Sequence, residues 1–346
     1  MYRGARTSAP FNFTLLLEGV CMSNRICNLL GCAYPIIEGG LAYVGNGLLA
    51  AAISEAGAFG QVGSGGRNAE NFAKEIQIAV MHTSRPFGVN VPISEHRDSS
   101  PYMSIIAQYA ENIRAVSLSA GNPRPFIEPL HQLGLIVITL ASTPEQAKKA
   151  EAAGADIVIC EGSEAGGHDG PAELTTMTLV PLCTSAVSIP IVAAGGIANG
   201  QTAAAAFCLG AEGIQMGTRF VATRECAAHD AYKEALVRAK VTDTDVIERS
   251  LGRITRVMKT PYVEQILAEE KKHLVDVGVL LQMISGKKNA LAALSGDLDD
   301  GYVYCGMGVG QISDIPPAAD VIQNVVRELR NTFQDAGKRA ETAFHF

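Results

Sequence analysis

The chain has 346 residues, of which 47% are hydrophobic and 18% are charged, and its formal net charge is −7. This length and balance suit a globular protein with a large buried core and exclude a disordered or fibrous chain. The negative charge and the absence of any lysine or arginine run argue against nucleic-acid binding. No stretch is long and apolar enough to span a membrane. Neither nucleic acid nor a membrane is therefore an expected partner.

Eight cysteines are scattered along the chain, with no CxxC pair and no cysteine–histidine cluster at zinc-site spacing. This pattern predicts reduced thiols in a cytoplasmic protein and no metal site. Residues 1–21 contain Arg3, Arg6 and a short apolar run that Glu18 interrupts. We expect them to form an N-terminal extension, with the folded part beginning at Met22.

Short apolar runs alternate with segments of helical periodicity from Tyr34 onward, which is typical of repeated βα units. Eight strands are expected, at residues 35–38, 59–62, 87–91, 115–119, 136–140, 156–160, 191–194 and 213–216. Helices are expected between them, at residues 47–56, 69–81, 103–111, 126–133, 144–153, 177–186 and 201–209. Eight strands joined by crossovers predict an α/β fold, a closed (β/α)8 TIM barrel. A doubly wound open sheet is the alternative, but no GxGxxG opens the first helix.

The repeat changes after Phe220. Residues 224 to about 307 are charge-rich and helical in periodicity, without the alternation typical of strands, and they predict a helical cap domain over residues 224–310. The barrel domain is expected over residues 22–223. A last helix, beginning at Ala318 and ending near Phe333, should return to the barrel within residues 316–335. The polar tail after Gln334 is expected to fray.

The most informative stretch is ADIVICEGSEAGGHDG, residues 155–170. It begins as an apolar β-branched run that predicts a buried strand, and then changes abruptly to Glu161, Gly166, Gly167 and His168. Glycine lets the backbone approach a ligand closely, and histidine exchanges protons near neutral pH. Because chemistry in parallel α/β proteins lies at the carboxyl ends of strands, we predict that His168 is catalytic.

Three more glycine-rich segments follow predicted strands, at residues 38–42, 193–197 and 215–220. The loops after strands seven and eight of such barrels often hold a phosphate, and two adjacent phosphate loops suit a ligand such as FMN. Asn90, at the end of the third strand, could bind the edge of a planar ring. Alone, each feature fits a tight turn, a cap or a solvated side chain better than a ligand site. Their shared location at strand ends favours one pocket.

Several motifs resemble the nitronate monooxygenase (2-nitropropane dioxygenase) family, which includes FMN-dependent enoyl-acyl-carrier-protein reductases and some NAD(P)H:quinone reductases. The motifs are GSEAGGHDG, AAGGIANG, GAEGIQMGTRFVATRE, NRICNLLGCAYPIIEGGLAYV, FGVNV, SAGNPRPFIEPL and LTTMTLVPL. They occur in order between about Asn24 and Leu329. The resemblance implies an FMN-binding TIM barrel with a smaller helical domain.

The resemblance also implies roles for single residues. His168, which ends AGGH, takes the catalytic role. Flavin contacts are implied for Gly39, Gly40, Leu41, Asn90, Glu161, Gly166, Gly195, Gly196, Gln215, Met216, Gly217 and Thr218. The chain departs from the family at Glu38-Gly39-Gly40-Leu41, where many members have Gln-Gly-Gly-Met. It also has Glu161 where monooxygenases often have Gln and enoyl reductases often have Glu.

Two enzymatic functions follow from this resemblance. The first is oxidation of alkyl nitronates by O2 through FMN to carbonyl compounds and nitrite, with His168 stabilising the nitronate or removing the α-proton of a nitroalkane. The second is reduction of an enoyl thioester or a quinone, with NAD(P)H as the candidate electron donor. SAGNP and LTTMTLV resemble the enoyl reductases, whereas TDTDVIERSLGRITRV and GDLDDGYVYCGMGVGQISDIP resemble the monooxygenases and quinone reductases.

A flavin-free binding barrel is a third hypothesis, because one fold supports many functions, but the His168 motif disfavours it. The expected partner is a small-molecule substrate. A homodimer is kept as a hypothesis for the assembly.

Overall fold

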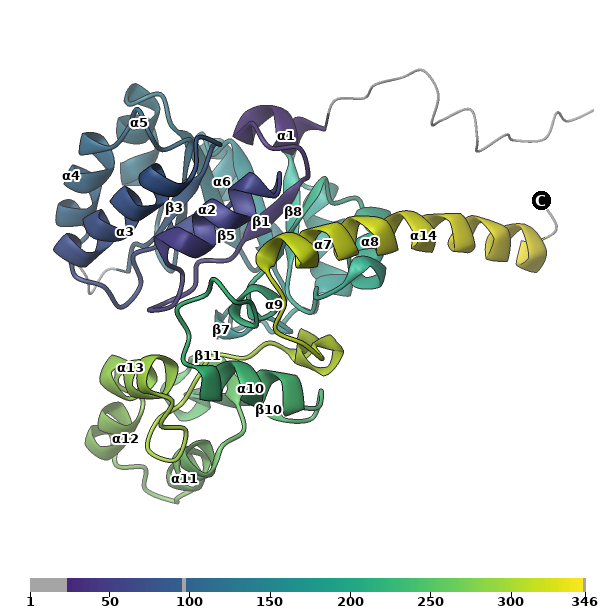
Figure 1. Cartoon of the computed structure of the whole chain (residues 1–346). Helices are drawn as coiled ribbons and strands as arrows, with labels where there is room; N and C mark the ends of the chain where they lie inside the picture. Colours follow the sequence, from purple (N-terminus) through teal and green to yellow (C-terminus); the bar gives the residue numbers. More distant parts are fainter. Residues whose placement is uncertain (1–23, 95–97, 345–346) are drawn as a thin grey trace, which may run out of the picture.

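The computed structural model of the chain describes residues 24–94 and 98–344, shown in Figure 1. The N-terminal extension predicted for residues 1–21 lies outside these described residues. Eight parallel strands form one sheet in the order β1-β9-β8-β6-β5-β4-β3-β2. They are β1 (Ile36–Glu38), β2 (Gln61–Gly63), β3 (Gly88–Pro92), β4 (Ala115–Ser119), β5 (Ile136–Ala141), β6 (Ile157–Glu161), β8 (Ile191–Ala194) and β9 (Gly213–Met216). A parallel bridge between Ile37 and Phe59 joins the two ends of the sheet, so the predicted barrel is confirmed.

Helices cover the outside of the barrel between the strands (Figure 1). They are α2 (Gly47–Glu55), α3 (Ala69–His82), α4 (Ser100–Gln108), α5 (Arg124–Gln132), α6 (Pro144–Ala152), α7 (Thr176–Thr184) and α8 (Gly200–Cys208). Side-chain caps at Asn68, Thr143 and Asn199 accept hydrogen bonds from the first turns of α3, α6 and α8 and fix where these helices begin. The predicted outer helices are confirmed, with small shifts at their ends.

The short helix α1 (Arg25–Leu30) closes one end of the barrel. Ile26 and Leu30 are fully buried against residues of the barrel interior. The carbonyl of Leu29 accepts a hydrogen bond from the Arg114 side chain, just before β4, at 2.7 Å. The Asn24 amide donates to the carbonyl of Glu212, just before β9, also at 2.7 Å. Because α1 contacts residues that precede strands, it blocks the amino ends, and the carboxyl ends are left for a ligand.

Residues 224–310 form a smaller lobe below the barrel in Figure 1. Its helices are α10 (Asp230–Arg238), α11 (Pro261–Glu270), α12 (Val277–Met283) and α13 (Gly286–Ser295). Part of this lobe has an apolar cluster of its own, which includes Ile247, Val257 and Leu280, whereas Leu236 and Val303 belong to the core cluster of the barrel.

The expectation that this lobe contains no strands is wrong. β10 (Thr244–Ile247) and β11 (Ile254–Met258) pair with each other, and β11 also pairs with β7 (Gly167–Asp169), which lies in the loop after β6. Both cap strands are short and interrupted by charged residues, so local periodicity did not reveal them. Their pairing with β7 joins distant segments, which a local pattern cannot show.

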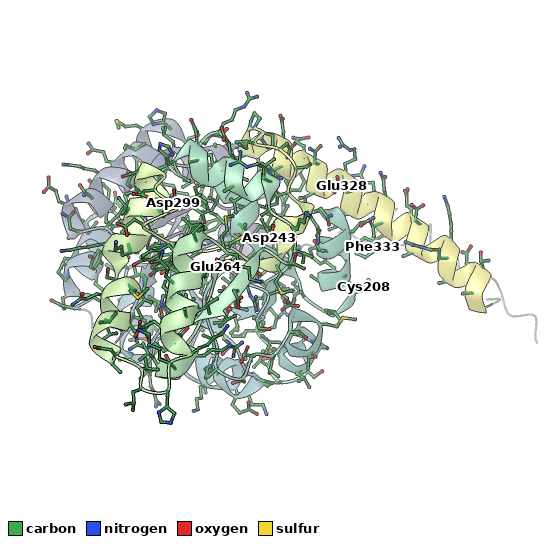
Figure 2. The ribbon with its side chains drawn as sticks, turned by 90° about the horizontal axis from the view of Figure 1, so that it is seen from below. Cys208, Asp243, Glu264, Asp299, Glu328 and Phe333 are labelled. Atoms are coloured by element: carbon green, nitrogen blue, oxygen red, sulfur yellow. The ribbon has the colours of Figure 1, made fainter. Side chains whose placement is uncertain are left out.

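The last helix, α14 (Ala318–Phe344), returns to the barrel and packs against α8 and α2, as predicted. The Glu328 carboxylate accepts a hydrogen bond from the Gly200 backbone N–H at 3.0 Å. Figure 2 places Glu328 and Phe333 on α14 beside Cys208 of α8 and shows the last turns projecting past the barrel. The expectation that the helix ends near Phe333 is wrong, because the alanine, lysine, arginine and glutamate residues that follow are strong helix formers.

None of the helices within residues 24–94 and 98–344 combines the length and the apolar character needed to cross a bilayer.

Candidate active site

A cavity of about 1450 Å³ opens at the carboxyl ends of the barrel strands, between the barrel and the cap. The sequence-predicted residues that line it are Gly39, Gly40, Leu41, Asn90, Glu161, Gly166, His168, Gly195, Gly196, Gln215, Gly217 and Thr218. Met216 is the exception, because its side chain is 1% exposed and packs into the apolar core. Its carbonyl accepts a hydrogen bond from the Gly39 N–H at 2.9 Å, so it contributes to the site through its backbone.

His168 lies on β7, where it pairs with Thr255 of the cap strand β11. Its ring is exposed to the cavity and packs edge-on against Tyr304, with 5.8 Å between the ring centroids. Surrounding protein atoms and the positive charge of Arg253 lower the pKa of His168. The imidazole is therefore neutral at pH 7, with one nitrogen that donates a hydrogen bond and one that accepts.

Three carboxyl groups line the same cavity, and they differ in their surroundings. The Glu164 carboxylate is held in place by the backbone N–H of Thr176 at 2.8 Å and the Thr176 hydroxyl at 3.1 Å. Burial raises the pKa of Glu161 to about 7. Burial, together with the charge of Glu161, raises the pKa of Asp169 to about 8. Both oxygens of Asp169 are buried and have no hydrogen-bond partner among the described residues. Near neutral pH, this region therefore holds protons that it can release.

The loops after β1, β8 and β9 present bare backbone to the cavity. Gly195 and Gly196 have φ angles of 98° and 72°, which favour glycine. A Cβ atom on Gly40 would lie 2.3 Å from Asn90 Oδ1, so only glycine fits there. A Cβ atom on Gly217 would meet only a Leu41 side-chain carbon, at 3.5 Å, so this position is open to the cavity.

Asn90 is oriented by its neighbours on β4. Its Nδ2 donates to the Ser117 hydroxyl at 2.9 Å, which leaves Oδ1 beside Gly40. An oriented amide oxygen, next to glycine backbone and opposite two loops of the phosphate-binding type, fits a planar phosphorylated ligand such as FMN.

Glu38, where many family members have Gln, does not line the cavity. It is fully buried, and its Oε2 accepts a hydrogen bond from the Gln61 N–H at 2.9 Å. Burial raises the pKa of this carboxyl group well above its ordinary value. The departure from the family pattern therefore lies behind the ligand site and not in it.

Several residues that line the cavity were not predicted from the sequence. Tyr232, Arg253 and Tyr304 come from the cap, and Arg124 and Lys149 come from the outer edge of the barrel. Arg124, Arg253 and Tyr304 carried a signal, because they lie within the motifs SAGNPRPFIEPL, TDTDVIERSLGRITRV and GDLDDGYVYCGMGVGQISDIP. Tyr232 and Lys149 are ordinary polar residues of helices, and only the fold brings them to the cavity.

The barrel, the cap and the glycine-lined cavity are together those of an FMN-type oxidoreductase on a TIM barrel. The family model for nitronate monooxygenase matches residues 23–328. This chain belongs to the nitronate monooxygenase family, which is flavin-dependent, and is therefore an enzyme.

Individual relatives agree with this assignment. A probable nitronate monooxygenase of Staphylococcus aureus (strain JH9) is 28% identical over 352 residues, covering 90% of this chain and 98% of the relative. The structure of FabK from Thermotoga maritima has a TM-score of 0.86 and 37% identity, covering 91% of this chain and 99% of that one. A nitroalkane oxidase from Streptomyces ansochromogenes has a TM-score of 0.78 and 28% identity, covering 90% of this chain and 99% of that one. The resemblance seen in the sequence is thus confirmed.

Proposed function

We propose that this protein is an FMN-dependent reductase that takes electrons from NAD(P)H and reduces an enoyl thioester. The observation that carries this proposal is the protonation of the groups beside His168. Burial raises the pKa of Glu161 to about 7 and that of Asp169 to about 8, so both carboxyl groups hold protons near neutral pH, and the imidazole is neutral. These groups offer proton and hydrogen-bond donors, which reduction of a C=C bond needs, and none of them is a cation that would pair with an anionic nitronate. They therefore favour the reductase, although the sequence placed nitronate oxidation first.

The residues that would hold FMN are those that supply bare backbone and the oriented amide. We assign the phosphate to the loops after β8 and β9, and the ring to the loop after β1, Asn90 and Gln215. When bound, FMN supplies the redox chemistry by accepting electrons from the donor and passing them to the acceptor.

The chain's own residues would position the thioester and handle protons. A neutral His168 can donate a hydrogen bond to the thioester carbonyl and stabilise the negative charge that develops on its oxygen. Reduction of a C=C bond also needs a proton, and Glu161 or Asp169 can deliver one near neutral pH. Tyr304 packs against the imidazole and limits its rotation.

Oxidation of alkyl nitronates is the second candidate. The family model and the Staphylococcus aureus relative favour it, and Arg253 places a cation near His168. A quinone is a further acceptor that the sequence resemblance implies for a reductase.

The test is an anaerobic absorbance titration of the purified FMN-loaded protein. We expect NADPH or NADH to bleach the flavin band, and an enoyl thioester such as crotonyl-CoA to restore it. Bleaching by an alkyl nitronate alone would contradict the reductase and support the second candidate. Restoration by a quinone but not by the thioester would keep the reductase and change its acceptor.

The role of His168 is tested by replacing it with alanine. We expect His168→Ala to keep stoichiometric flavin, because its side chain is not assigned to flavin binding, and to lose at least about 10²-fold in turnover. Turnover equal to that of the wild type would remove His168 from the mechanism.

A further inference from the structure

The cavity continues beyond the assigned flavin site as a second arm. This arm lies between the loops that follow β4 and β5, and it is lined by residues 119–124, by Ser142 and by one side of α6 as far as Ala153. It contains no glycine pair like Gly195-Gly196. The part of α6 that faces it carries Gln146 and Lys149.

The cationic side chains of the cavity differ in whether a neighbouring acidic group acts on their charge. Among the described residues, the lysine and arginine side chains that line it are Arg124, Lys149, Arg219 and Arg253. Arg219 is neutralised by Asp314, with 3.0 Å between Nη1 and Oδ1. Arg253 interacts with both His168 and the Glu248 carboxyl group.

Arg124 and Lys149 differ from this pair because both are in the second arm and neither forms an ion pair with a described residue. Both side chains are exposed. The amino end of α6 does not itself attract an anion, because the Thr143 hydroxyl caps it by accepting a hydrogen bond from the Gln146 N–H. The Gln146 side chain is also occupied, since its Oε1 accepts a hydrogen bond from the Ser142 N–H at 2.7 Å. Two unpaired cations in one arm favour an anionic ligand.

The Arg124 side of the arm lies across the barrel from the loop after β9, and the Lys149 side follows β5, two places from β8. In the closed ring of eight strands, β4 stands four places from β9, which is diametrically opposite. FMN carries a single phosphate, and the loops after β8 and β9 are assigned to it. The cations after β4 and on α6 are therefore available to a different anion.

We propose that Arg124 and Lys149 bind a phosphate ester of the co-substrate, an inference that rests on the proposed function. A nicotinamide dinucleotide and a phosphopantetheine thioester both have a reactive end and, far from it, phosphate groups. Either molecule can place its reactive end near His168 and its phosphate in the second arm. The shared chemistry is a phosphate ester held by an unpaired guanidinium and an unpaired ammonium group.

The experiment is isothermal titration calorimetry on the full-length, FMN-loaded protein. The probes are adenosine 2′,5′-bisphosphate, which represents the phosphate end of NADPH, and 4′-phosphopantetheine, which represents the thioester carrier. The variants are Arg124→Glu and Lys149→Glu. The matched control is Lys148→Glu, which makes the same charge change at the neighbouring position of α6, where the side chain is exposed and does not line the cavity. Flavin content verifies that each variant is folded.

We expect one probe to bind the wild type, and each arm variant to raise its Kd at least about tenfold, because an attraction becomes a repulsion. The control should stay within about twofold, and the affinity should fall with salt. The probe that binds identifies the source of the phosphate. Binding of neither probe, or equal Kd values in the arm variants and the control, would overturn the proposal.

Neither probe needs turnover, so the two proposals fail separately. If NAD(P)H does not bleach the flavin but the arm variants still lose the probe, the proposed function fails and the phosphate site stands.

Discussion

Asp169→Asn should change the pH dependence of stability. The Asp169 pKa is raised from an ordinary value of 3.8 to about 8, because the carboxyl group is buried and close to other acids. Below pH 4, both the folded and the unfolded chain hold this proton. Between pH 4 and 8 the unfolded chain releases it while the folded chain keeps it, so stability falls as pH rises. Above pH 8 both the folded and the unfolded chain have released the proton, so this group no longer changes stability with pH.

The size of this effect follows from the two pKa values. A difference of about 4 corresponds to ~5–6 kcal/mol at 1.36 kcal/mol for each pH unit. Solvent that reaches the residue through the cavity reduces this to ~2–4 kcal/mol. Asn cannot ionise, so the variant should gain this amount relative to the wild type between pH 4.5 and 8.5.

The assay is urea unfolding of the FMN-loaded proteins, followed by circular dichroism at pH 5, 7 and 8.5. Asp299→Asn is the control, because this carboxyl group is exposed on the cap (Figure 2). Burying the Asn amide has a cost that does not depend on pH, so it lowers the free energy of unfolding of Asp169→Asn equally at every pH. The test is therefore how the difference in free energy of unfolding between variant and wild type changes with pH. Parallel curves for Asp169→Asn and the wild type would refute the argument that Asp169 is neutral in the folded protein.

Three further predictions concern the flavin site and the proton donor. Gly217→Asp should yield apoprotein, because its carboxylate would occupy the place assigned to the phosphate; stoichiometric flavin after purification would refute that assignment. Gly40→Ala should lower flavin content at least about tenfold by displacing Asn90, whereas Gly337→Ala, in open space, should not; equal flavin in both variants would contradict this. If Glu161 and not Asp169 is the proton donor, turnover of the wild type with saturating thioester should fall as pH rises through about 7, where Glu161 loses its proton. Glu161→Gln should be slow and flat over that range, and an unchanged pH profile would exclude this residue.

The barrel could be predicted because each of its strands is a short apolar run in a regular βα repeat. The site could be predicted for the same reason. Glu161 and His168 follow one such run, and Gly195 and Gly217 follow others, so a parallel barrel had to bring them to one end. The roles of single residues came from the family resemblance, and apart from Met216, whose side chain alternates into the core, every residue so assigned lines the cavity.

The rest depends on contacts between distant parts of the chain. Lys149 is an ordinary exposed residue in sequence, and only the course of the cavity sets it apart from Lys148. The raised pKa values of Glu161 and Asp169 result from burial, which composition does not reveal.

The pairing of β7 with β11 has a consequence for motion. His168 belongs to the barrel by position in the chain, but its strand is hydrogen-bonded to the cap through only three residue pairs. Amide hydrogen exchange at residues 167–169 should therefore follow the opening of the cap and not that of the barrel. If a substrate enters by displacing the cap, the strand that carries the histidine is released with it, and the cap must close again before His168 is in place for a catalytic cycle.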